Sequence, residues 1–318
     1  MKVYRRIEDF LGVKNPIVTT GTFDGVHLGH QKILNSLQQI AQKQNGTSVL
    51  LTFDPHPRKV LFPEDVDLEL ITTLDEKIQL LEQFGLEHLI ICPFTIEFSK
   101  ISSLNFIREI MVRQLKAHTL VIGYNHHFGR NREGSFKHLM EFGPIYGFEV
   151  CEIPAKDVDS IEVSSTKIRH SILAGDLEVA QSYLGHPFFI TGKVVHGKQL
   201  GRTIGFPTAN IQISQPDKII PPNGVYWVQV ELEAGHKLVN GMMNIGVRPT
   251  IDSGQRSIEV HLLNWSTEIY GKVLKVNILK RSRPEIKFGS LTLLQEQLHL
   301  DLQNANAYFE NLTNLKLR

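Results

Sequence analysis

Cysteine is scarce in this sequence of 318 residues, in which Cys92 and Cys151 are the only two. Neither lies in a CxxC motif or a Cys/His cluster, which argues against a disulfide scaffold and favours a reducing compartment. Long apolar runs are also lacking, since stretches such as residues 89–92 fall far short of the roughly 20 residues that a membrane helix needs. The N-terminal segment lacks the apolar core of a signal peptide. We therefore expect a cytoplasmic protein that does not enter a membrane.

A strong net charge is missing as well. Lys and Arg number 34 against 33 Asp and Glu, which gives a formal charge of +1. No overall field therefore favours nucleic acid or an anionic membrane, and no basic stripe with interleaved aromatic residues points to nucleic acid. The hydrophobic content of 42% is too high for a disordered chain, and the length predicts two domains. The oligomeric state stays open.

In the first half, short apolar segments alternate with segments of helical periodicity. Strands are predicted at residues 17–20, 48–53, 88–92, 119–123 and 149–153, and helices at 30–44, 75–84 and 103–115. Such alternation is typical of an α/β domain with parallel strands joined by crossover helices. Ligands bind to these sheets where the carboxyl ends of strands meet helix N-termini.

The second half has a different pattern. After helical segments at residues 165–174 and 177–183, the sequence predicts strands at 189–195, 225–232, 238–243, 257–263 and 273–279. Without intervening helical periodicity, these strands indicate an antiparallel barrel or sandwich of about six strands. Apolar residues spaced by three or four from Leu291 to Leu312 predict a final amphipathic helix. We place the domain boundary between residues 184 and 185, which gives domains 1–184 and 185–318.

A glycine-rich turn with paired histidines follows the first of these strands. Gly21 and Gly25 allow the backbone to turn tightly and to approach a ligand closely. His27 and His30 are three apart at a helix start, where free N–H groups and the helix dipole favour anions. The turn is neither a Walker A loop nor a GxGxxG fingerprint. Taken alone, its HxGH motif also fits histidines that cap or pack a helix.

Residues 20–30 (TGTFDGVHLGH) resemble the HxGH nucleotidyltransferases, and more closely the adenylyltransferase module of the bacterial bifunctional riboflavin kinase/FAD synthetase family. Residues 52–57 (TFDPHP) and 163–169 (VSSTKIR) are similar to further motifs of that module. The resemblance implies a Rossmann-like domain with His27, His30 and Arg169 as catalytic residues. It also implies nucleotide and phosphate contacts at Gly21, Phe23, Asp24, Gly25, Gly29, Ser164, Ser165 and Thr166. Residues 164–166 equally fit a helix cap, and both roles are compatible.

Residues 123–129 (GYNHHFG) depart from the family pattern. Relatives usually carry Asp or Asn followed by aromatic residues there, so the resemblance implies a flavin contact at Asn125. His126 and His127 are unusual at their positions. They fit either a contact with nucleotide or flavin, or exposed loop residues.

A second polar segment, residues 201–210 (GRTIGFPTAN), lies in the strand-rich half. Thr208 and Asn210 are two apart, so in an extended segment they project to the same side. A hydroxyl and an amide oxygen are hard ligands that suit Mg²⁺. A Gly-Pro turn followed by two polar strand residues, without any metal, fits the same segment equally. The further candidate phosphate contacts here are Gly201, Arg202 and Gly205.

The same segment resembles the GRxxGxPTAN signature of riboflavin kinases. Residues 258–263 (IEVHLL) are also similar to that family and place Glu259 at its catalytic carboxylate. The resemblance implies a six-stranded antiparallel β-barrel with a C-terminal helix, and Mg²⁺ held by Thr208 and Asn210. Flavin contacts are implied by similar segments at Asn244, Arg248 and Arg283.

Together the matches span most of the chain, with both modules in the family's order. They imply that the protein phosphorylates riboflavin with ATP to FMN, and then transfers AMP from a second ATP to FMN, giving FAD and pyrophosphate. Mg²⁺ and ATP are the implied cofactor and co-substrate. Three alternatives stay open: a riboflavin kinase with weak or lost adenylyltransferase activity, a metal-dependent hydrolase that uses the clustered histidines, and a barrel that only binds its ligand.

Overall fold

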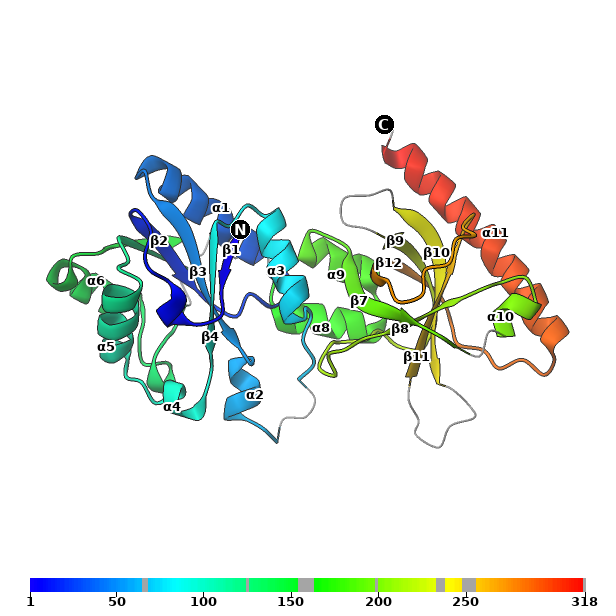
Figure 1. Cartoon of the computed structure of the whole chain (residues 1–318), viewed down its shortest axis with the longest axis horizontal. Helices are drawn as coiled ribbons and strands as arrows, with labels where there is room; N and C mark the ends of the chain where they lie inside the picture. The colour runs from blue at the N-terminus through cyan, green and yellow to red at the C-terminus, as the bar shows by residue number, and fades with distance from the viewer. Residues whose placement is uncertain are drawn as a thin grey trace. The chain divides into compact units, whose positions relative to one another are not determined.

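The computed structural model describes residues 1–64, 68–123, 126–153, 163–197, 200–232, 238–247 and 256–316 (Figure 1). The chain forms two compact units, Met1–Ser165 and Thr166–Arg318. Each unit has its own sheet and its own core. The domain boundary expected at 184/185 lies inside the second unit and stays a prediction.

The first unit contains a six-stranded parallel sheet in the order β1-β4-β3-β2-β5-β6. Its strands are β1 (Lys2–Tyr4), β2 (Pro16–Thr20), β3 (Thr47–Asp54), β4 (His88–Pro93), β5 (Thr119–Gly123) and β6 (Glu149–Ile153). All five predicted strands are present, and β1 is an addition of three residues at the sheet edge. After β2 the chain builds β3 and β4 on one side, and it later adds β5 and β6 on the other. The carboxyl ends of β2 and β5 therefore border the point where a parallel sheet binds its ligands.

Helices enclose this sheet (Figure 1). The longer ones are α1 (Leu28–Lys43), α3 (Leu74–Gln83), α6 (Phe136–Tyr146) and the π-helical segment η3 (Phe106–Gln114), which continues the single turn α5 (Ser103–Asn105). The short ones are η1 (Ile7–Asp9), η2 (Asp24–Val26), α2 (Pro57–Leu61), α4 (Ile96–Ser99) and η4 (Arg130–Arg132). The core between helices and sheet is apolar, with Ile17, Val18 and Leu51 fully buried.

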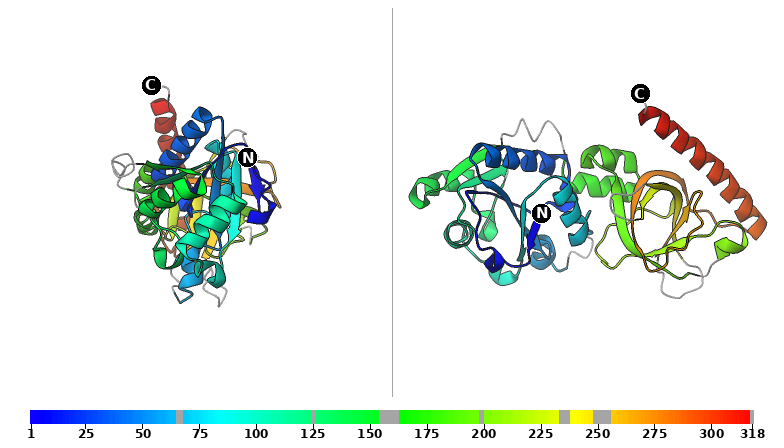
Figure 2. Two further views of the ribbon diagram at one scale, coloured as in Figure 1. Left: turned by 90° about the vertical axis from the view of Figure 1, so that its left-hand side faces the viewer. Right: turned by 45° about the horizontal axis from the view of Figure 1, so that its top comes forward.

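The second unit is a closed barrel of antiparallel strands in the order β10-β11-β8-β7-β12-β9. The strands are β7 (Phe188–Val195), β8 (Ala209–Gln212), β9 (Gly224–Glu231), β10 (Val239–Val247), β11 (Arg256–Leu262) and β12 (Val273–Pro284). Two helices, α8 (Ser165–Ala174) and α9 (Leu177–Leu184), precede them, and α10 (Leu200–Thr203) lies between β7 and β8. The right-hand view of Figure 2 looks into the barrel. The prediction of six antiparallel strands is confirmed, and the fold is a barrel rather than a sandwich.

The C-terminal helix α11 (Leu291–Lys316) packs on the outside of the barrel. Ala305 and Phe309 are buried in one cluster with Trp227 of β9 and Met242 of β10. The predicted apolar face therefore does dock, although Leu291 in its first turn stays 63% exposed. Within the described ranges, no helix is both long and apolar enough to cross a membrane.

Candidate functional site

The turn after β2 folds back on itself before α1 begins. Phe23 (φ 50°), Gly25 (φ 82°) and Val26 (φ 40°) all have left-handed backbone conformations. Only glycine adopts such angles without steric cost, so the predicted need for glycine at position 25 is confirmed by its conformation. The chain then enters α1 at His27.

Asp24 holds this turn against the chain that leads into α3. Its buried carboxylate accepts hydrogen bonds from the amides of Ile71 (3.1 Å) and Thr72 (3.0 Å) and from the Thr72 hydroxyl (3.1 Å). The Thr72 oxygen in turn accepts from the amide of Gly25 at 3.0 Å. The hydroxyl of Ser165 donates to the Asp24 carbonyl oxygen at 3.2 Å. The carboxylate thus fixes the loop, and its role in nucleotide binding stays a prediction.

The two histidines of the turn stack on each other. The ring centroids of His27 and His30 are 3.7 Å apart with 17° between the planes, and Phe23 stacks on His30 at 4.6 Å. His27 also caps α1, because its Nδ1 accepts from the amide of His30 at 3.4 Å. Nδ1 of His30 is buried and has no hydrogen-bond partner in the part of the chain that the structure describes. The turn therefore combines a histidine that caps the helix with a second histidine that has a buried nitrogen without a partner among the described residues.

His30 is neutral near pH 7. Burial lowers the pKa of its imidazole well below 6.5, and the nearby charges of His27 and Lys77 lower it further. A neutral imidazole can donate a hydrogen bond to a phosphate oxygen but brings no positive charge. The site therefore needs a cation from elsewhere to bind a polyphosphate.

The other predicted contacts of this site differ in where they lie. Gly21 donates its amide to the carbonyl of Leu51 at 3.1 Å, and Gly29 is buried in the first turn of α1. Ser164 and Ser165 belong to the first unit, whereas Thr166 and Arg169 belong to the second. Asn125 lies outside the described residues. The structure of the first unit thus brings Gly21, Phe23, Asp24, Gly25, His27, Gly29, His30 and Ser165 into one region.

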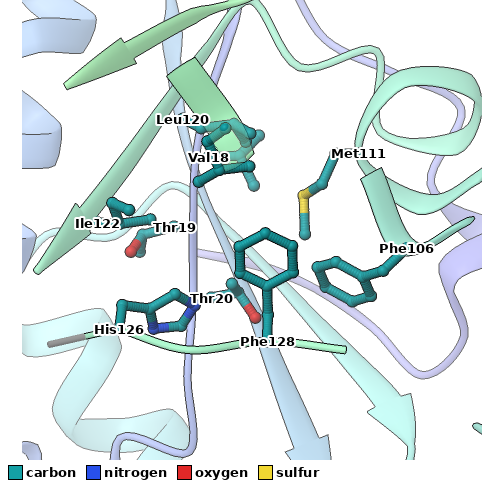
Figure 3. Close-up of a pocket in the computed structure, with 10 residues that line it drawn as sticks. Val18, Thr19, Thr20, Phe106, Met111, Leu120, Ile122, His126 and Phe128 are labelled. Carbon is teal, nitrogen blue, oxygen red and sulfur yellow. The ribbon is translucent and has the colours of Figure 1, made fainter. Parts of the chain in front are cut away.

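A small cavity of about 10 Å³ lies between the carboxyl ends of β2 and β5 (Figure 3). Most of its lining is apolar, but Oγ1 of Thr20 and Nε2 of His126 are both buried, and neither has a partner among the described residues. Burial lowers the pKa of His126 to about 4, with smaller contributions from His127 and Arg132. The apolar lining consists of side chains from Val18, Phe106, Met111, Leu120, Ile122, Phe128 and Leu139.

The two unusual histidines therefore have different environments. His126 contributes to the cavity, and its ring stacks on that of Phe128 with centroids 6.2 Å apart and 24° between the planes, whereas His127 is exposed. The cavity beside them has room for little more than one water molecule, and Thr20 and His126 supply its two polar atoms without a partner among the described residues.

The second cluster lies on the barrel, where three strands meet at one rung. Glu259 of β11 pairs with Asn210 of β8 on one side and with Asn244 of β10 on the other. Residues directly opposite in antiparallel strands share a face, so the three side chains lie in a row. The Thr208 hydroxyl donates to Oε2 of Glu259 at 3.1 Å. Three predicted residues, Thr208, Asn210 and Glu259, are thereby brought together.

This cluster offers oxygen ligands of the kind that Mg²⁺ prefers. It combines a hydroxyl, an amide carbonyl and a carboxylate, and Asn210 is only 6% exposed. The absence of a Cβ at Gly197 leaves room for the Asn210 amide, which a larger residue there would displace. Among the described residues, no group of three or more His, Cys, Asp and Glu side chains is placed to hold a metal ion.

The turn before β8 requires both of its glycines. The amide of Phe206 donates to the carbonyl of Gly201 at 2.7 Å, and a Cβ on Gly201 would collide with the carbonyl of Phe206. Gly205 has a φ of 87°. The predicted phosphate ligand Arg202 is exposed and lies 3.7 Å from Glu268.

Arg283 has a partner that the sequence did not suggest. Its guanidinium binds the carboxylate of Asp301 on α11 through two parallel contacts, Nε to Oδ1 at 3.0 Å and Nη2 to Oδ2 at 2.7 Å. The pair anchors α11 to β12, and the flavin contact expected at Arg283 stays a prediction. Asn244 is exposed on β10, and Arg248 lies outside the described residues.

Sequence reasoning missed several charged residues that the structure buries, among them Asp301 and Lys77. Asp301 lies within the apolar stripe of α11, and Lys77 shares the buried side of α3 with Leu80 and Leu81. A charged residue in the apolar register of a helix indicates a buried partner. That signal was available in both helices.

Comparison with known proteins finds one family for each half of the chain. The FAD synthetase family profile matches residues 13–167, and the riboflavin kinase family profile matches residues 184–309. The chain is 38% identical over 293 residues to a bifunctional riboflavin kinase/FMN adenylyltransferase of Escherichia coli K12, with 92% of each chain covered. It is equally 38% identical over 300 residues to the protein of that name from Bacillus subtilis, with 93% of each covered.

A solved structure agrees over nearly the whole length. A crystal structure from Streptococcus pneumoniae, described as a macrolide-efflux protein, matches with a TM-score of 0.85 and 30% identity, covering 96% of this chain and 98% of the other. The chain belongs to the bifunctional riboflavin kinase/FMN adenylyltransferase family.

Proposed function

We propose that this chain makes FAD in two steps, phosphorylating riboflavin with ATP to FMN and then transferring AMP from a second ATP to FMN. The observation that carries the proposal is that one chain holds both clusters, the stacked histidines beside β2 and the Thr208–Glu259 pair on the barrel. A kinase that has lost its second activity would not need to keep the histidine turn.

In the kinase step, Glu259 accepts the proton of the terminal ribityl hydroxyl of riboflavin. That oxygen forms a bond to the γ-phosphorus of ATP while the bond to ADP breaks. The hydrogen bond from Thr208 fixes the orientation of the Glu259 carboxylate at 3.1 Å. Mg²⁺, held by Thr208 and Asn210, would offset the charge of the ATP phosphates.

In the adenylyl step, a phosphate oxygen of FMN attacks the α-phosphorus of ATP and pyrophosphate leaves, so no covalent enzyme intermediate is needed. The amides at the start of α1 and the His27 and His30 imidazoles bind the phosphates. Arg169 stays the third predicted catalytic residue of this step. Because His30 is neutral, it serves as a hydrogen-bond donor or acceptor. The enzyme gains its rate by positioning the two substrates and stabilising charge.

The flavin ring of FMN binds beside the segment after β5. Its predicted contact is Asn125, and the polar pair Thr20 and His126 lies beside the turn that binds the phosphates. The remaining flavin contacts, in the barrel, are the predicted Asn244, Arg248 and Arg283.

The protein is cytoplasmic and acts on small molecules. We keep the domain boundary at 184/185, which the start of the riboflavin kinase match at residue 184 supports.

Product analysis tests the function directly. Incubation with riboflavin, ATP and Mg²⁺, followed by chromatography over time, should give FMN first and FAD later. Glu259→Ala should slow FMN formation by about 10²–10⁴-fold, the usual contribution of a general base, yet still convert added FMN to FAD. His30→Ala should do the reverse and accumulate FMN.

Matched controls are available on the same chain. The exposed Glu141 and His127 should tolerate replacement by alanine without loss of either reaction. FMN without any FAD from the unmodified chain would favour the kinase that lacks its second activity. If Glu259→Ala and His30→Ala each abolished both reactions, the assignment of separate sites would be wrong.

A further inference from the structure

Lys77 is a buried cation beside the histidine turn that the mechanism above does not use. It is only 7% exposed, which is rare for lysine. The residue lies one turn into α3, on the side that also buries Leu80 and Leu81. A lysine in such a position needs negative charge nearby to remain protonated.

The start of α3 is fixed relative to the turn. Thr73 and Glu76 form a reciprocal capping box, with contacts of 3.2 Å and 2.9 Å. The two residues before it, Ile71 and Thr72, donate their amides to the Asp24 carboxylate. Lys77 therefore belongs to a helix that is attached to the phosphate-binding turn by several hydrogen bonds.

Charges from two separate elements act on the Lys77 ammonium. Asp24 in the turn and Asp54 at the carboxyl end of β3 favour its charged form, and Lys77 itself lowers the pKa of His30 on α1. Lys77 therefore lies close enough to the turn, to β3 and to the start of α1 to interact with charged groups on each of them. Burial outweighs the two carboxylates, because the net effect is a lowered pKa of Lys77. The protein alone thus compensates this cation incompletely.

We propose that Lys77 binds the β- and γ-phosphates of ATP in the adenylyl step and stabilises the leaving pyrophosphate. The inference rests on the proposed function. As the α-phosphorus bonds to the FMN oxygen, its bond to the bridging oxygen breaks and the electron pair passes to pyrophosphate. Lys77 stays protonated and offsets this growing charge at short range. Bound polyphosphate supplies the negative charge that the buried ammonium lacks.

Lys77→Met tests the proposal, because methionine fills similar space without charge. We expect kcat/KM for ATP in FAD formation to fall by about 10²-fold, in line with the loss of one charge-stabilising donor. Inhibition by added pyrophosphate should weaken by at least about 10-fold. Riboflavin phosphorylation by the same chain should be unchanged. Lys77→Arg, which keeps the charge, should restore much of the loss.

Lys43→Met, an exposed lysine at the far end of α1, is the matched control and should change neither reaction. If methionine prevents folding, Lys77→Gln replaces it in the same assays. A folded variant without charge at residue 77 that keeps normal kcat/KM for ATP and normal pyrophosphate inhibition overturns the role of Lys77. An unmodified chain that forms FMN but no FAD would instead overturn the proposed adenylyl transfer, and this inference with it.

Discussion

His126 couples the stability of the first unit to pH. Its imidazole is buried at the cavity beside β2 and β5, and its pKa is lowered to about 4. In the unfolded chain the same side chain titrates near its ordinary value of about 6.5. Between these two values the unfolded chain binds a proton that the folded chain does not, so the free energy of unfolding falls as the pH falls.

We expect this dependence to reach about 1.4 kcal/mol per pH unit for His126 between pH 6.5 and 4. His126→Phe should flatten the slope by that amount. His30 contributes in the same direction, so some slope should remain. The measurement is urea unfolding at several pH values, followed by circular dichroism. Equal slopes for the His126 variant and the unmodified chain would contradict the burial of a neutral imidazole.

At the scale of elements, α11 is held to the barrel by one buried ion pair as well as by apolar packing. The Asp301 carboxylate is 2% exposed and accepts from Arg283 of β12 and from Gln297 at 2.9 Å. Removing one partner of such a pair leaves a buried charge without compensation, which typically costs about 3–5 kcal/mol. An exposed pair contributes far less, about 0–1 kcal/mol.

Asp301→Ala should therefore lower the stability of the second unit by about 3–5 kcal/mol. The control is Glu178→Ala, which removes the exposed pair between Glu178 and Lys280 at 3.0 Å and should cost less than about 1 kcal/mol. Tryptophan fluorescence reports this unit selectively, because Trp227 and Trp265 both belong to it. A loss for Asp301→Ala as small as that of the control would show that α11 does not depend on the pair.

The elements that the sequence predicted are those with a regular period or a clear cap. The helix α3 is one example, since the helical spacing of its apolar residues predicted it at 75–84, and the structure adds a capping box at Thr73 and Glu76. The helix α6 was not predicted, because Gly143 and Pro144 disfavour helix on local grounds, and tertiary packing overrides them. The four-residue strand β8 is too short for a recognisable alternation.

The candidate sites were predictable where they depend on neighbours in sequence. The alternation of side chains along a strand predicted that Thr208 and Asn210 lie together. The barrel brings Glu259 beside them from a strand about 50 residues away, and only the family resemblance pointed to Glu259 in advance. The contact of Asp24 with Thr72 spans 48 residues, and no local pattern encodes it. Long-range pairing of buried polar groups is decided by the complete fold.

For the whole molecule, the cluster proposed for each reaction lies within one compact unit, although Thr166 and Arg169, two further predicted residues of the adenylyl site, belong to the second unit. The barrel cluster lies within Thr166–Arg318, and the histidine turn with Lys77 lies within Met1–Ser165. The formal charge of only +1 fits this arrangement, because phosphate is bound by local groups and no general positive field is required. The sites are therefore chemically separable.

This separation predicts complementation between two damaged chains. Glu259→Ala alone should give little FAD from riboflavin, and His30→Ala alone should stop at FMN. Mixed in equal amounts, the two variants should form FAD from riboflavin, since FMN released by one barrel can bind at the histidine turn of the other chain. FAD should appear after a lag, and the lag should shorten when FMN is added. The control variants Glu141→Ala and His127→Ala should each form FAD from riboflavin without a second variant in the mixture. If the mixture accumulated FMN without FAD, while added FMN was still converted, transfer would be confined to one intact chain.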